Sequence, residues 1–154
     1  MTDMDRADLI TALSSAIAAA PTGESAMQQA VRLLKDAVPY YTWVGIYVVE
    51  GNELVLGPFI GKPSPHMRIS LGQGICGAAA TAKATIVVDD VNADARYLAC
   101  SIETKSEIVV PIMRGDTVLG EIDIDSDQAA AFGPADRALL EPVAAMLAER
   151  LEEE

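Results

Sequence analysis

The stretch 61-GKPSPHMRISLGQGICGAAATAK-83 decides between two fold classes. Its segment GQGICG has the G-x-G-x-x-G spacing of a dinucleotide-binding turn, and Cys76 within it is one of only 2 cysteines in the chain. A dinucleotide-binding turn requires a parallel sheet built from β-α-β units. A loop that presents a thiol does not require a parallel sheet, so the flanking sequence can distinguish the two interpretations.

The flanking sequence argues against a dinucleotide site. The segment before the glycines, 67-MRISL-71, is short and carries an arginine, whereas a parallel strand buried on both faces is a continuous apolar run. The small-residue helix that follows, to about Lys83, is shorter than the ~10–12 residues of a β-α-β crossover. Two interpretations remain: a glycine turn that leads the backbone into a helix, and a loop that presents Cys76 and backbone N–H groups to a small ligand.

The rest of the chain predicts helices at both ends of a set of hairpins. Helical spacing of apolar residues marks the segments 3–19, 24–37 and 134–153. Two-residue alternation marks two hairpins, 42–50 with 53–61 and 106–114 with 117–126. Further strands are expected at 67–71 and 85–90. This order indicates an α+β fold with a largely antiparallel sheet.

Length and net charge limit the classes of function that the protein can have. The 154 residues are 51% apolar and suit one domain, residues 1–154. A net charge of −12 with only 11 Lys and Arg argues against nucleic acid and against an anionic membrane surface. The N-terminus lacks the basic region of a signal peptide, and no apolar run reaches ~20 residues, so we expect a cytoplasmic protein. One His and two distant Cys predict no metal site.

Several side chains are candidates for chemistry. Cys76 lies at a predicted helix N-terminus, which lowers a thiol pKa, although each cysteine is by propensity a small buried hydrophobe. Asp123 and Asp125 alternate along one strand and share a face, where each would raise the pKa of the other, and Glu107 starts the neighbouring strand. The alternative is an edge strand with solvated acids. Trp43 and Tyr47 also share a face, as core residues or as a pocket lining.

Five segments resemble the free methionine-R-sulfoxide reductases, which are single GAF domains. They are 41-YTWVGIYVVEGNELVLGPFIGKP-63, 72-GQGICGAA-79, 97-YLACS-101, 106-SEIVVPI-112 and 118-VLGEIDIDS-126. The resemblance extends over roughly residues 25–150. It implies a six-stranded, mainly antiparallel sheet with the N- and C-terminal helices packed on one face.

The resemblance also implies a reaction. The Cys100 thiolate attacks the sulfoxide sulfur of the free amino acid while acids among Glu107, Asp123 and Asp125 protonate the oxygen. Methionine leaves, the resulting sulfenic acid condenses with a second cysteine such as Cys76, and thioredoxin with NADPH reduces the disulfide. No bound cofactor is implied. Glu107 and Asp125 would hold the substrate ammonium, with Trp43 and Tyr47 around the thioether methyl group.

The sequence departs from the family pattern at two positions. His66 stands where the family has a third cysteine, and Ser101 replaces an acid after the nucleophile. Either Cys76 resolves Cys100 directly, or an external thiol does, or the chain is a GAF module that only binds a small metabolite. We expect His66 to face solvent. A homodimer through the N-terminal helix, residues 1–22, is a further expectation.

Overall fold

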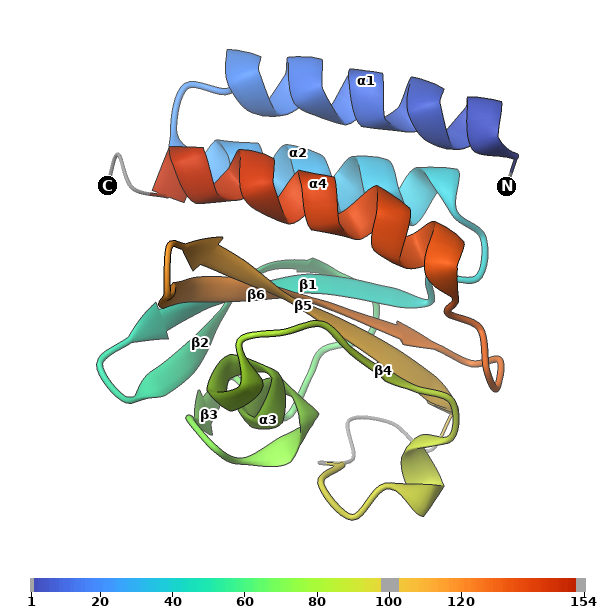
Figure 1. Ribbon diagram of the computed structural model, residues 1–154, viewed down its shortest axis with the longest axis vertical. Helices are drawn as coiled ribbons and strands as arrows, with labels where there is room; N and C mark the ends of the chain where they lie inside the picture. The colour runs from blue at the N-terminus through green and yellow to red at the C-terminus, as the bar shows by residue number, and fades with distance from the viewer. Residues whose placement is uncertain (1, 98–102, 152–154) are drawn as a thin grey trace.

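The computed structural model describes residues 2–97 and 103–151, which contain four α-helices and six strands (Figure 1). The helices are α1 (Asp3–Ala19), α2 (Gly23–Ala37), α3 (Gly74–Ala82) and α4 (Pro134–Leu151), with a 3₁₀ turn η1 (Val91–Ala93). The strands are β1 (Trp43–Glu50), β2 (Glu53–Ile60), β3 (Arg68–Ser70), β4 (Ile86–Val88), β5 (Ser106–Arg114) and β6 (Thr117–Ser126). The predicted elements are all present.

The strands form one antiparallel sheet in the order β3-β2-β1-β6-β5-β4. Helices α2 and α4 cover one face of the sheet, α1 lies outside them, and α3 lies on the opposite face (Figure 1). The prediction that the terminal helices share a face is therefore confirmed, and α3 adds a second covered face. No helix among the described residues combines the length and the apolar character that crossing a bilayer requires.

The strand order excludes the dinucleotide interpretation. β3 and β4, which flank the glycine-rich turn, lie at opposite edges of the sheet, so they cannot form a β-α-β unit. The glycines have a local role instead. Gly72 and Gly74 have φ values of +92° and +66°, and a Cβ on Gly77 would lie 2.7 Å from the backbone nitrogen of Gly72. The turn thus folds onto the first turn of α3, which places Cys76 against the sheet.

Strand alternation divides the core into two layers. Ile122 and Ile124 of β6 belong to the apolar cluster beneath α2 and α4, together with Val44 and Ile46 of β1. The intervening residues of the same strands point toward α3. The α3 side therefore receives Trp43, Tyr47 and the acids of β6.

Asp136 in α4 joins that helix to the start of β1. The hydroxyl groups of Tyr40 and Tyr41 each donate to its Oδ1 at 2.6 Å, and the Gly133 N–H donates to its Oδ2 at 2.8 Å.

We expect Asp136→Ala to lower the free energy of unfolding by about 2 kcal/mol, because the buried Tyr41 hydroxyl loses its acceptor. Urea unfolding measures this effect. Asp116→Ala, in the exposed β5–β6 turn, is the control, and an equal midpoint shift in both variants would contradict the assignment.

Candidate active site

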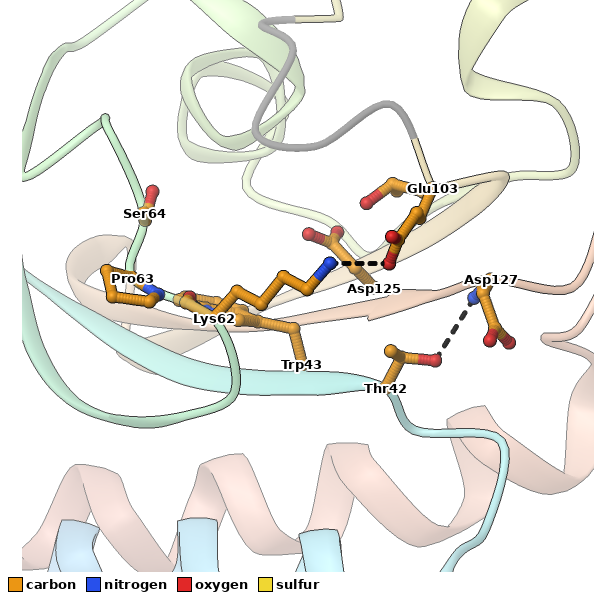
Figure 2. Close-up of a pocket in the computed structure, with 9 residues that line it drawn as sticks. Thr42, Trp43, Lys62, Pro63, Ser64, Glu103, Asp125 and Asp127 are labelled. Atoms are coloured by element: carbon orange, nitrogen blue, oxygen red, sulfur yellow. Dashed lines mark hydrogen bonds and ion pairs between the residues drawn. The ribbon is translucent and has the colours of Figure 1, made fainter.

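Of the cavities in the described structure, two on the α3 side of the sheet are lined by the predicted site residues. The larger, the Trp43 cavity, has a volume of about 70 Å³ and is lined by Thr42, Trp43, Lys62, Pro63, Ser64, Glu103, Thr104, Asp125 and Asp127 (Figure 2). The smaller, the Cys76 cavity, has a volume of about 20 Å³, room for a water molecule, and is lined by Tyr47, His66, Ile69, Gly74, Ile75, Cys76, Glu107 and Asp123. The cavities bring together all the predicted site residues that the structure describes.

A row of carboxyl groups runs along β6 beneath both cavities. Glu121, Asp123 and Asp125 alternate along the strand and are 0%, 3% and 4% exposed. Glu107 of β5 lies directly across from Asp125, on the other side from Trp43 of β1. Because β6 is a central strand, the alternative of an edge strand with solvated acids is wrong.

Burial raises the pKa values of these acids. The pKa of Glu121 is raised to about 9, first by burial and then by the charge of Asp123. Burial likewise raises the pKa of Asp123, and it holds that of Asp125 well above its usual range, with the Asp123 charge adding to the effect. Both oxygens of Glu121 and the Oδ1 atoms of Asp123 and Asp125 are buried and have no hydrogen-bond partner among residues 2–97 and 103–151. Burial thus favours the protonated forms of these acids, and two of them, Asp123 and Asp125, line the cavities.

Glu121 is the site residue that sequence reasoning missed. Its signal was available, because the alternation that paired Asp123 with Asp125 extends one step back to position 121.

Cys76 is the third residue of α3, and its side chain points into the sheet. It is 4% exposed, and its Sγ, a carboxylate oxygen of Glu107 and one of Asp123 all lie within 4.8 Å of one another. Burial raises its pKa well above the usual value, and the four neighbouring carboxyl groups raise it further. The expected lowering by the helix N-terminus is therefore wrong: the partial charge of a helix end does not offset desolvation and four acids.

The Cys76, Glu107 and Asp123 side chains lie close enough to share one cation. Among the residues that the structure describes, this is the one group of His, Cys, Asp and Glu side chains with that proximity. An ammonium group is also a cation that carboxylate oxygens bind through charge-assisted hydrogen bonds.

Trp43 and Tyr47 share the α3 face of β1, as the alternation predicted, and each lines one cavity. The Trp43 indole N–H donates to the Lys62 carbonyl at 2.9 Å, and its ring stacks on Phe59 at 5.7 Å between centroids. The Tyr47 hydroxyl donates to the His66 carbonyl at 2.8 Å. Both aromatic residues thereby fix the loop between β2 and β3 over the acids.

His66 does not face solvent as expected. It is half-buried and lines the Cys76 cavity together with Glu107 and Asp123. Its backbone N–H donates to Ser64 Oγ at 3.1 Å, which turns the loop inward. The position where the family pattern has a third cysteine therefore belongs to the cavity.

Cys100 and Ser101 lie outside the described residues. The chain re-enters the structure at Glu103 and Thr104, which line the Trp43 cavity. Glu103 and Thr104 are therefore the described residues nearest in sequence to the predicted nucleophile on its C-terminal side.

Comparison with known proteins identifies the family of the chain. Residues 22–151 match the GAF domain family. A free methionine-R-sulfoxide reductase of Saccharomyces cerevisiae is 46% identical over 109 residues, 68% of this chain and 60% of the yeast protein. The free methionine-R-sulfoxide reductase of Escherichia coli is 35% identical over 115 residues, 75% of this chain and 69% of that protein.

A solved structure resembles the whole chain. The X-ray structure of free methionine-R-sulfoxide reductase from Neisseria meningitidis in complex with its substrate has a TM-score of 0.92 and 33% sequence identity, and the match covers 99% of this chain and 92% of that chain. At this identity the likeness supports membership of one family as well as a shared fold.

Proposed function

Because the chain belongs to the free methionine-R-sulfoxide reductase family of GAF domains, we propose that it reduces free L-methionine-R-sulfoxide to methionine. The observation that carries the proposal is the row of buried carboxyl groups with raised pKa values, which lies beside a thiol and an aromatic-lined cavity. Sulfoxide reduction needs a proton for the oxygen, a cation-binding group for the substrate ammonium and an apolar surface for the methyl group. Asp123, Asp125 and Trp43 are the residues that we propose for these three roles.

In the proposed reaction the Cys100 thiolate attacks the sulfoxide sulfur. Asp123, whose pKa is raised by burial, donates a proton toward the oxygen, with Glu107 beside it. Methionine leaves and Cys100 retains the oxygen as a sulfenic acid. Cys76 then condenses with it, forming a disulfide and releasing water, and an external dithiol reduces the disulfide.

Asp125 is the proposed receptor for the substrate ammonium. It lines the Trp43 cavity and is flanked by Trp43 and Glu107, and its buried Oδ1 has no hydrogen-bond partner in the described part of the chain. An ammonium group at this oxygen would favour the ionised carboxylate, reversing the effect of burial on its pKa.

Asp125→Asn is expected to lower kcat/KM about 30-fold or more, because the amide keeps the shape but removes the charge paired with the ammonium. Steady-state assays with the free sulfoxide measure this loss. Asp127→Asn is the matched control, since Asp127 lines the same cavity but is exposed. Equal losses in the two variants would contradict a specific role for Asp125.

The test of the function is turnover with each methionine sulfoxide epimer, free and peptide-bound, coupled to thioredoxin and NADPH. Turnover of the free R epimer alone supports the proposal. If no epimer turns over, release of methionine in a single-turnover assay decides between broken recycling and absent chemistry. Binding without any methionine release would favour the second candidate, a GAF module that only binds a small metabolite, which the loss of the third cysteine to His66 favours.

Three further properties are predictions from the family. They are thioredoxin as the reductant, a cytoplasmic location and a homodimer through α1.

A further inference from the structure

The charges that line the two cavities are unequal. Among the described residues, five acids line one or the other: Glu103, Glu107, Asp123, Asp125 and Asp127. Lys62 is the one Lys or Arg that lines either cavity in that part of the chain. A ligand with a carboxylate therefore meets a single fixed positive charge.

The proposed substrate is a zwitterion, and the acids explain the binding of its ammonium group but not of its carboxylate. They attract the ammonium group, but they repel the carboxylate that the same carbon carries. We propose that Lys62 binds the substrate carboxylate and thereby restricts the site to free amino acids. This inference rests on the proposed function and adds the group that recognises the second charge.

The loop backbone holds Lys62 at the rim of the Trp43 cavity. Its carbonyl accepts the indole N–H of Trp43, and a Cβ on the preceding Gly61 would lie 2.5 Å from the Trp43 ring, so only glycine lets the loop approach this closely. Figure 2 shows the Lys62 side chain extended toward Glu103, in the cavity that Asp125 also lines. The ammonium and carboxylate receptors thus belong to one cavity.

The present partner of Lys62 is exchangeable. Lys62 Nζ lies 2.8 Å from Glu103 Oε2, and the two side chains are 69% and 58% exposed. Exposed ion pairs of this kind contribute little stability, so a ligand carboxylate can replace or share the Glu103 contact at low cost. A residue within a peptide has an uncharged amide at the same position and offers Lys62 no opposite charge.

The experiment compares free L-methionine-R-sulfoxide with its carboxamide, which keeps the ammonium and lacks the carboxylate. Binding is measured by calorimetry in the Cys100→Ser background, so that the readout does not depend on turnover. The emission of Trp43, the one tryptophan of the chain, is a second readout from within the cavity. We expect Lys62→Met to weaken binding of the free acid about tenfold or more and to leave the carboxamide unchanged. Lys62→Arg is expected to retain the preference for the acid.

Two controls separate recognition from structure. Lys105→Met removes an exposed lysine that lines neither cavity, and it should leave both affinities unchanged. Glu103→Gln removes the ion pair but keeps Lys62, and it should not weaken the free acid. If Glu103→Gln reproduces the effect of Lys62→Met, the lysine acts only through the pair and the inference is overturned.

The remaining outcomes are also decisive. The inference is overturned if the Cys100→Ser protein binds the free acid and the carboxamide with equal affinity. It is also overturned if Lys62→Met weakens the binding of both compounds equally. Turnover of the free R epimer by the wild-type protein would then leave the proposed function standing. If the parent binds neither compound and the wild type turns over neither, the proposed function and this inference both fall.

Discussion

Replacing Cys76 with serine is expected to leave a single rapid reduction intact and to slow every later one. The Cys76 thiol is buried and its pKa is raised, so at neutral pH it is poorly suited to attack the sulfoxide itself. Its proposed role is the later and slower condensation with the sulfenic acid on Cys100. Quenched-flow release of methionine should therefore show a burst of one equivalent per protein molecule, followed by a slow steady state in the coupled assay.

The companion variant, Cys100→Ser, should show no burst and should lose about 10⁴-fold or more in kcat, as enzymes do when the nucleophile is removed. Full multiple turnover by Cys100→Ser would remove the basis for assigning it as the nucleophile. A normal steady state in Cys76→Ser would instead show that an external thiol resolves the sulfenic acid. Because the thiolate fraction of Cys76 increases with pH, wild-type recycling should accelerate between pH 7 and 9 if Cys76 is the resolving group.

The local elements could be predicted because their signals are local. Two-residue alternation and the turns at Gly51-Asn52 and Gly115-Asp116 define the hairpins β1–β2 and β5–β6 without any knowledge of the rest. The separation of β3 and β4 to opposite edges could not be read from spacing, because strand order depends on packing against the helices. The glycine-rich turn therefore looked like a nucleotide motif until the order was known.

In the site, the features that depend on one strand could be predicted, and those that depend on contacts between distant segments could not. Alternation correctly placed Asp123 with Asp125, and Trp43 with Tyr47, on the α3 face. The predicted lowering of the Cys76 pKa was wrong because burial of the thiol raises it, and the acids of β5 and β6, more than thirty residues away in the chain, raise it further. The inward position of His66 was missed for a similar reason, since the Tyr47 hydroxyl and Ser64 fix it by contacts that no spacing reveals.

Glu121 has no assigned step in the proposed reaction, and its burial has a measurable cost. Its pKa is raised from 4.5 to about 9 in the folded protein, whereas the unfolded chain has the ordinary value. As the pH rises above 4.5 the unfolded state loses its proton first, so stability falls until the folded state also ionises near pH 9. At pH 7, about 2.5 pH units above the ordinary value, the cost is about 3 kcal/mol.

Glutamine has the shape of the protonated acid and never ionises. Glu121→Gln is therefore expected to raise the free energy of unfolding by about 3 kcal/mol at pH 7, with a gain near zero at pH 4.5 and a maximum above pH 9. Urea unfolding across this range measures the difference, in which the shared contributions of Asp123 and Asp125 cancel to first order. The exposed Glu149→Gln is the control and should change stability by no more than about 0.5 kcal/mol. A gain that is the same at every pH would mean that the pKa of Glu121 is the same in the folded and unfolded states, which would contradict the prediction. A loss of stability at pH 7 would mean that the Glu121 carboxyl makes contacts that an amide cannot replace.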